Sequence, residues 1–330
     1  MPEARPGSSV ARARDLGLGI ALAALVVFSS LTAPQFATAG NLQRIMLDIS
    51  LLLMVAAGQT MVMLTRNIDL SVGSILGLSG IIVGFYLKDN PETGVLAILS
   101  AGVVIGLVLG LVNGVLVAWG RVPAVIATLG TLTVYRGLVF ILSGGQQVNP
   151  QDIPRHLVAV ARPGVLGVPL MVLLAVAVTA AAGLFLRYGR TGRAMYAVGS
   201  NPAAARLRGI DADRVILIAY LVTGALSGLA GVLYAARFAT VNPASAGTGF
   251  ELQVIAATVI GGTSVLGGRG GIGGTALGAL FLGTVANALA VAGVSGFWQR
   301  AVEGFIIVVA VVLDAAVRRA ALTGGRGRDV

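Results

Sequence analysis

The chain lacks most of the residue types that carry catalytic or metal chemistry. It contains no cysteine, which excludes disulfides, thiolate catalysis and cysteine metal sites. A single histidine, His156, excludes a multi-histidine metal site and leaves a serine–histidine–acid triad without support. The one lysine, Lys88, is followed by Asp89, so the Gly-Lys-Ser/Thr sequence of a phosphate-binding loop is missing. The sequence therefore predicts no ATPase site, no other catalytic site, and no metal or cofactor bound by this chain.

Charge is also scarce. Charged residues form 11% of the 330 residues and hydrophobic types form 56%, whereas a soluble domain carries about 25% charged residues. The mean hydropathy is +0.92. So little polar surface cannot coat a water-soluble globule of this size, and much of the apolar surface must face lipid. The 47 glycines are typical of transmembrane helices whose backbones approach closely.

Apolar runs long enough to cross the bilayer predict an all-α polytopic membrane protein, with residues 1–330 forming one transmembrane domain. The eighth run is short and interrupted by glycine, which indicates a half-helix or a re-entrant segment. The first run follows three arginines, as in a signal peptide, but no clear cleavage site follows it, so we expect a retained span. The ten candidates are 16–33, 45–65, 70–87, 94–119, 122–142, 165–186, 215–236, 251–266, 272–292 and 297–317.

The arginines and the lysine are distributed unevenly between the two sides of this predicted topology. With the N-terminus in the cytoplasm, sixteen of them lie in inner segments and six in outer segments. By the positive-inside rule both termini are cytoplasmic. We therefore expect an inner-membrane protein with cytoplasmic tails at 1–15 and 318–330 and a large cytoplasmic loop at 187–214. The same distribution explains the net charge of +10 without nucleic acid as a partner.

A weak internal repeat has an offset of 173 residues. It aligns Gly110 with Gly283 and Gly120 with Gly293, so that helices 2–5 correspond to helices 7–10 in the opposite orientation. It also suggests pairing Asp69-Leu70 with Glu251-Leu252. Chance alignment of glycines is a competing explanation. Small residues at spacing four on the fourth and ninth runs predict tight helix packing; they are Gly102, Gly106, Gly110, Gly114, Gly274 and Gly278.

Polar residues within apolar runs have two interpretations. They can form hydrogen bonds between helices, or they can line a path for a polar solute. Asp69 and Glu251 open predicted helices, where an acid can also act as a cap. The residues of this kind are Asp48, Gln59, Asn113, Arg136, Asn287 and Glu303. As the candidate translocation path we select Asp69, Asn113, Glu251 and Asn287.

The inner loop contains a predicted short helix. Asn201 is a favourable N-cap, Pro202 suits the first helical position, and Gly209 suits the C-terminal cap. So short a helix is not stable alone, so it must dock on anionic lipid or on a protein. The predicted docking segment is Asn201, Pro202, Ala203, Ala204, Ala205, Arg206, Leu207, Arg208 and Gly209.

Three segments resemble the ribose-type permeases of bacterial ATP-binding-cassette importers, within the wider group that includes branched-chain amino-acid permeases. They are Asn67–Gly73, Gly192–Ile210 and Glu251–Leu280. Many relatives have glycine at the position of Asn67, and asparagine tolerates the same left-handed backbone. The likeness extends over nearly the whole chain and is weakest at 1–40 and 143–165.

The resemblance implies a permease that carries a monosaccharide. Its partners would be a second permease, either identical or related, two cytoplasmic ATPase domains that bind ATP and magnesium, and a periplasmic sugar-binding protein. Residues 199–210 fall where the family places its coupling helix. A permease for an amino acid and an ion-coupled secondary transporter remain alternatives, although acids deep in the membrane, which ion coupling requires, are scarce.

Overall fold

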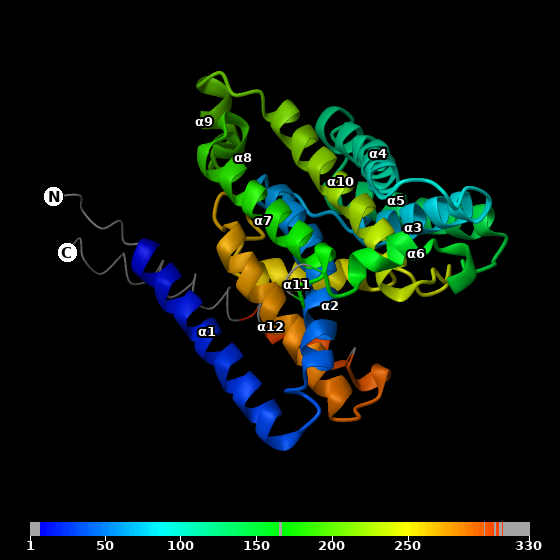
Figure 1. The fold of residues 1–330 in the computed structure, drawn as a ribbon. Coiled ribbons are helices and arrows are strands. Elements are labelled where there is room, and N and C mark those ends of the chain that lie inside the picture. The colour runs from blue at the N-terminus through cyan, green and yellow to red at the C-terminus, as the bar shows by residue number, and fades with distance from the viewer. Residues whose placement is uncertain (1–6, 165–166, 300, 307, 310–311, 313–330) are drawn as a thin grey trace.

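The computed structural model describes residues 7–164, 167–299, 301–306, 308–309 and 312, and most of this part is helical (Figure 1). Among the residues described, eight helices are long and apolar enough to cross a bilayer. The α-helices are α1 (Gly7–Thr32), α2 (Ala39–Leu64), α3 (Val72–Asp89), α4 (Val95–Gly114), α5 (Ala124–Ser143), α6 (Arg155–Val158), α7 (Leu170–Tyr188), α8 (Arg190–Ser200), α9 (Pro202–Leu207), α10 (Ala212–Phe238), α11 (Phe250–Ile260) and α12 (Ile272–Val291).

The polytopic helical fold is confirmed, and eight of the ten predicted spans correspond to long helices within the described residues. The eighth run is α11, which has only 11 residues. At a rise of about 1.5 Å per residue such a helix is roughly 16 Å long and does not cross the hydrocarbon core. The half-helix expectation therefore fits this segment. The tenth run, 297–317, and the C-terminal tail at 318–330 lie partly or wholly outside the described residues.

Several short elements complete the chain. A five-residue π-helix, η1 (Val115–Trp119), extends α4. The loop between α5 and α7 contains α6 and two short 3₁₀ helices, η2 (Pro150–Asp152) and η3 (Ala159–Ala161). An antiparallel bridge between Val148 and Val241 ties this loop to the segment after α10.

The glycine stripe on α4 packs directly against the backbone of α10. A Cβ atom at Gly102, Gly106 or Gly110 would collide with the backbone of α10, chiefly at Gly224 and Gly228. Gly274 and Gly278 of α12 meet α11 in the same way, at Gly261 and Ala257. The prediction of tight packing is confirmed for both stripes, because only glycine permits backbones to approach this closely in lipid.

The packing reproduces the predicted repeat. Adding 173 to the bounds of α2 gives 212–237, and α10 spans Ala212–Phe238. Each of these two helices packs against helices from the other half of the sequence. Helix α10 packs against α3 and α4, and α2 packs in the equivalent way against α11 and α12. The two central helices are antiparallel, since the end of α2 around Met61 and Leu64 shares a buried cluster with the start of α10 around Ala212 and Val215.

The two halves meet where α3 and α11 begin. A Cβ atom at Gly73 would collide with the carbonyl of Gly247, and one at Gly247 would collide with the carbonyl of Gly73. Gly73 shifted by the repeat offset falls on Ala246, one residue from this reciprocal contact. The axis that relates the halves therefore passes close to these two glycines.

The first helix, α1, lies apart from this core. It runs along α12 at the edge of the molecule (Figure 1), and most of its apolar side chains are exposed. Arg14 ties its start to the turn after α11, donating to the carbonyl oxygens of Gly261 at 3.0 Å and Gly262 at 3.1 Å. The exposed apolar surface of α1 is suited to lipid or to a neighbouring chain.

Candidate functional site

The loop between α2 and α3 holds a fully buried carboxylate, Asp69. Its Oδ1 accepts hydrogen bonds from the backbone N–H of Ser71 at 2.8 Å and from the Ser71 hydroxyl at 2.7 Å. Asn113 of α4 donates to the same hydroxyl at 2.7 Å, and Thr131 of α5 donates to Asn113 Oδ1 at 2.6 Å. Two of the predicted path residues, Asp69 and Asn113, thus belong to one polar network that joins three segments.

This network is closed to solvent. The exposed fractions of Asp69, Ser71 and Asn113 are all 0%. Asp69 Oδ2 has no hydrogen-bond partner. Burial raises the pKa of Asp69 to about 6, against the lowering effect of the hydrogen bonds from Ser71 and Asn113. Ser71 is the N-cap residue of α3, but no side chain forms a cap hydrogen bond there, so the predicted cap is not formed. Asp69 instead bonds to Ser71 itself, and neither Asp69 nor Asn113 lines the two cavities described below.

The second half of the chain repeats this turn. Asn242 Oδ1 accepts a hydrogen bond from the N–H of Ala244 at 2.9 Å, and these two residues are 173 positions beyond Asp69 and Ser71. The predicted pairing of Asp69 with Glu251 is therefore wrong, because Asn242 occupies the equivalent turn. Sequence reasoning missed it because an asparagine before a proline reads as an ordinary loop signal.

Glu251 lies instead in the first turn of α11, beside the contact between the two halves. A Cβ atom at Gly73 would lie 2.5 Å from Glu251 Oε2. Arg136 of α5 reaches the same region and donates to the carbonyl oxygen of Ala246 at 2.8 Å. The structure therefore places Glu251 close to the start of α3, among residues that join the halves.

A cavity of about 270 Å³ with both polar and apolar lining lies between α2, α11, α12 and the residues Gln299 and Glu303. The predicted path residue Asn287 lines it. Its polar lining is Asp48, Gln253, Asn287, Gln299 and Glu303, and its apolar lining includes Leu52, Phe250, Ala256, Leu282, Ala286 and Ala290. Three residues that the sequence singled out, Asp48, Asn287 and Glu303, thus meet in one cavity.

Hydrogen bonds fix several of these side chains. Asn287 and Asn41 exchange two amide hydrogen bonds, at 2.8 and 3.0 Å. Gln253 donates to Glu303 at 2.9 Å. Asp48 forms an ion pair of 3.2 Å with Arg237 at the end of α10. Because amide and carboxylate groups alternate with an aromatic ring and aliphatic side chains, the cavity can hold a small polar solute.

Two of the segments that carry the family resemblance, Gly192–Ile210 and Glu251–Leu280, meet at the end of α2, just before the third segment. Arg66 donates to the carbonyl oxygen of Ser200 at 2.8 Å and also contacts the carbonyl oxygen of Gly199. The N–H of Gly268 donates to the carbonyl oxygen of Leu64 at 3.0 Å. Gly199 has no room for a Cβ, which would collide with Leu64. The structure therefore joins the end of α2, the end of α8 and the glycine-rich turn at 267–271.

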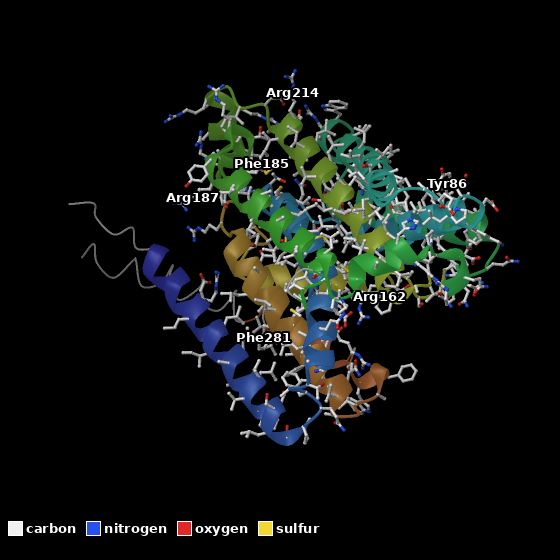
Figure 2. All side chains as sticks on the ribbon, viewed as in Figure 1. Tyr86, Arg162, Phe185, Arg187, Arg214 and Phe281 are labelled. Atoms are coloured by element: carbon white, nitrogen blue, oxygen red, sulfur yellow. The ribbon has the colours of Figure 1, made fainter. Side chains whose placement is uncertain are left out.

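The predicted short helix forms beside this junction as α9. Asn201 Oδ1 accepts a hydrogen bond from the N–H of Ala204 at 3.0 Å, and Pro202 is the first helical residue. Gly209 follows the helix with a φ of 76°, which favours glycine. Ala205 is buried, whereas Leu207 is 91% exposed. Figure 2 shows Arg214, which follows this segment, projecting outward at the same end of the molecule.

Comparison with known proteins identifies the family. The family described as "Branched-chain amino acid transport system / permease component" matches residues 41–311. The chain is 40% identical over 299 residues to the ribose import permease protein RbsC of Escherichia coli strain K12, covering 89% of this chain and 92% of the relative.

A second relative is the autoinducer 2 import system permease protein LsrC of Escherichia coli strain K12 / DH10B, which is 34% identical over 305 residues, covering 92% of this chain and 88% of the relative. No solved structure matches. The chain belongs to the branched-chain amino-acid transport system permease family, among the permease subunits of ATP-binding-cassette importers.

Proposed function

We propose that this chain forms the translocation path for a monosaccharide in an ATP-binding-cassette importer. The observation that carries the proposal is the 40% identity to a ribose import permease over 89% of this chain and 92% of the relative. The second relative is named for import of autoinducer 2. The cavity lined by Asn287 supports a neutral polar solute, because its amide groups can exchange hydrogen bonds with hydroxyl groups.

Transport by this chain would depend on separate ATPase subunits. The sequence has no Gly-Lys-Ser/Thr phosphate-binding loop, and its one lysine is Lys88. ATP and magnesium would therefore be bound by two partner ATPase domains. A periplasmic binding protein would deliver the sugar, and a second permease, identical or related, would complete the path.

The segment Asn201–Gly209 is our proposed contact with the ATPase. Helix α9 is attached to the rest of the protein by the buried side chain of Ala205 and by an ion pair of 3.8 Å between Arg206 and Asp213. Its outer side carries Leu207, which is 91% exposed. A short helix fixed at its base with a free apolar side chain at its tip fits a cleft in a soluble partner. Movement of that cleft would then be transmitted through Gly199 and Arg66 to α2.

Reconstituted uptake tests the proposed function. Proteoliposomes that contain the chain, its ATPase and its binding protein should accumulate ribose or a related pentose when ATP is supplied. An imposed proton gradient without ATP should produce no accumulation. Accumulation that follows the proton gradient and ignores ATP would identify a secondary transporter, and uptake of branched-chain amino acids in place of sugars would reject the substrate class.

Replacing Leu207 by aspartate tests the coupling contact. We expect Leu207→Asp to reduce co-purification of the ATPase roughly tenfold or more, because it removes the apolar anchor of the interface. Leu266→Asp is the matched control, since Leu266 is 69% exposed in the neighbouring turn and lies outside α9. Equal co-purification with both variants would reject the assignment. Ala205 and Gly209 are poorer test sites, because burial and a positive φ make their replacement disrupt α9 itself.

A further inference from the structure

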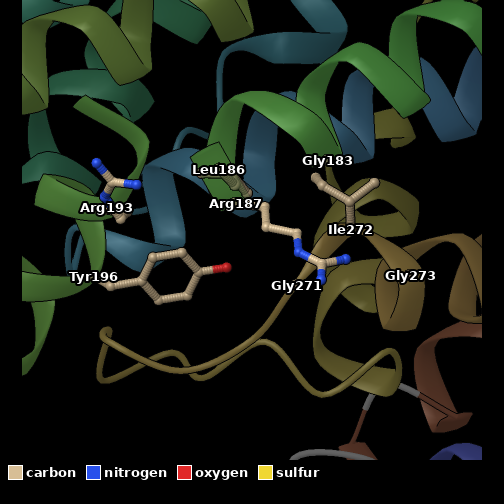
Figure 3. Close-up of a pocket in the computed structure, with 8 residues that line it drawn as sticks. All are labelled: Gly183, Leu186, Arg187, Arg193, Tyr196, Gly271, Ile272 and Gly273. Carbon is tan, nitrogen blue, oxygen red and sulfur yellow. The ribbon is translucent and has the colours of Figure 1, made fainter. Parts of the chain in front are cut away.

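A second cavity, of about 460 Å³, lies between the end of α7, α8 and the start of α12 (Figure 3). It is not part of the cavity lined by Asn287. Its lining contains two arginines and a tyrosine but no acidic residue. The lining residues are Gly183, Leu186, Arg187, Arg193, Tyr196, Gly271, Ile272 and Gly273.

The charged groups of this cavity lack an acidic partner among the described residues. Arg187 extends toward Gly271 and Ile272, and the Tyr196 hydroxyl points into the same space (Figure 3). Within the described part of the chain, neither the Arg187 nor the Arg193 guanidinium group forms an ion pair or a side-chain hydrogen bond. Two guanidinium groups without a carboxylate create an excess of positive charge that suits a phosphate, which they can bind through paired N–H groups.

The backbone at the start of α12 adds to this preference. No side chain caps α12, which begins at Ile272 after Gly271. The Tyr196 hydroxyl donates to the carbonyl oxygen of Gly270 at 3.1 Å and so fixes the turn that leads into the helix. No atom lies within 4 Å of the position of a Cβ at Gly273, so the first turn faces open space. The free N–H groups of that turn are donors for an anion that the arginines attract.

The surface beside the cavity indicates what carries the phosphate. Leu173, Val176 and Leu184 of α7 are 43%, 57% and 58% exposed. Their spacing puts them on the same helix face as Arg187. An apolar stripe on a membrane-spanning helix therefore runs directly into a basic cavity. Tyr188, which is 61% exposed and lies under the Arg187 guanidinium at 5.2 Å, marks the membrane interface at that end.

We propose that this cavity binds the headgroup of an anionic phospholipid, with its acyl chains along the exposed face of α7. The arginines and the start of α12 hold the phosphate, and Leu173, Val176 and Leu184 contact the chains. An acidic segment of a protein partner would neutralise the arginines but would leave the apolar stripe unused. Basic cavities between transmembrane helices at the cytoplasmic surface commonly hold anionic lipids in this way.

Native mass spectrometry of the purified chain tests the proposal with phosphatidylglycerol and phosphatidylcholine as probes. The chain should retain phosphatidylglycerol in preference. Arg187→Ala combined with Arg193→Ala should reduce that retention, roughly fivefold for each arginine removed. Arg190→Ala is the matched control, because it removes an exposed arginine of the same loop that lies neither in the cavity lining nor in the proposed ATPase contact, and it should retain phosphatidylglycerol like the original chain.

A second variant separates the site from a folding defect. Gly273→Glu places a carboxylate in open space next to the arginines, and it should also lower phosphatidylglycerol retention without a change in thermal stability. Retention equal to that of the original chain in both variants would overturn the proposal. Displacement of the lipid by millimolar inorganic phosphate would overturn it in favour of a small-anion site. Normal lipid retention with loss of ATPase co-purification in the double variant would overturn it in favour of a protein contact.

Discussion

Asp69 carries a negative charge into a part of the molecule that water does not reach. It is 0% exposed, and one of its two carboxylate oxygens has no hydrogen-bond partner. A charge in such a position is costly. The acid nevertheless satisfies both the N–H and the hydroxyl of Ser71, which would otherwise be buried without a partner. The buried charge of Asp69 therefore lowers the stability of the protein, while its hydrogen bonds to Ser71 fix the backbone geometry at the start of α3.

Replacing Asp69 by asparagine should stabilise the protein near neutral pH. Asparagine keeps the accepting oxygen and removes the charge. Because the pKa of Asp69 is about 6 in the folded chain, against 3.8 ordinarily, protonation of this acid contributes stability that is present below about pH 4 and lost as the pH rises through 6. The free energy of unfolding in detergent should therefore favour Asp69→Asn increasingly as the pH rises from 4 to 7, by up to about 3 kcal/mol.

Asp69→Leu is the contrasting variant. It leaves the Ser71 N–H without an acceptor and should therefore be less stable than Asp69→Asn by about 2 kcal/mol at every pH, because neither variant carries the acid. If Asp69→Asn at pH 7 proved as unstable as Asp69→Leu, the carboxylate would be needed as a charge, and its role as a hydrogen-bond acceptor for Ser71 would be wrong.

Among the elements, helix ends that depend on hydropathy could be predicted, and ends that depend on tertiary contacts could not. The run at 122–142 became α5, Ala124–Ser143, within two residues. The run at 251–266 ended early, at Ile260, because Gly261 and Gly262 turn the chain so that it packs against Gly274. Hydropathy reports that a segment avoids water. It does not distinguish lipid from the interior of the protein.

The candidate site shows the same limit. Asn113 and Asn287 were equivalent as polar residues in apolar helices, yet Asn113 is sealed within hydrogen bonds and Asn287 lines a cavity. Gln253 and Phe250, which also line that cavity, were not singled out, because α11 looked like an ordinary helix start in the sequence. Asn287 lines a cavity because α2, α11 and α12 come together around it, and this tertiary packing cannot be read from the sequence.

The contact between α4 and α10 is the element-scale feature most open to test. Gly106→Ala should destabilise the chain by about 1–3 kcal/mol, because its methyl group would collide with the carbonyl of Gly224 and force the two helices apart. Thermal unfolding in detergent measures the loss. Gly130→Ala in α5 is the matched control, since no atom lies within 4 Å of its Cβ position, and it should be neutral or slightly stabilising. Equal losses in both variants would show that the close approach does not set the stability.

At the scale of the whole molecule, the repeat explains why the two halves contact as they do. The turns at Asp69 and Asn242 precede α3 and α11, and those helices meet at Gly73 and Gly247. The halves thus touch at equivalent points near their axis, which is the arrangement expected when one half rocks against the other. The junction of Arg66 with Gly199 and Ser200 lies at one end of the bundle, where a moving partner could act on it.

The structure fixes which loops share a side, and the arginines predict which side is inside. Because the chain contains no cysteine, single cysteines can be introduced without background labelling. Ala203→Cys and Leu266→Cys, both at exposed positions, should react with a membrane-impermeant maleimide only in inside-out vesicles. Glu92→Cys and Ser295→Cys should react only in right-side-out vesicles.

The structure requires that Ala203→Cys and Leu266→Cys react from the same side. Gly268 bonds to Leu64 and Arg66 bonds to Ser200, so the loops after α2, α9 and α11 lie on the same side of the membrane. If Ala203→Cys reacted from the outside, the segment proposed to contact the ATPase would lie on the side of the membrane where ATP is not available, and that proposal would be wrong. Reaction of Ala203→Cys and Leu266→Cys from opposite sides would contradict the inverted repeat itself.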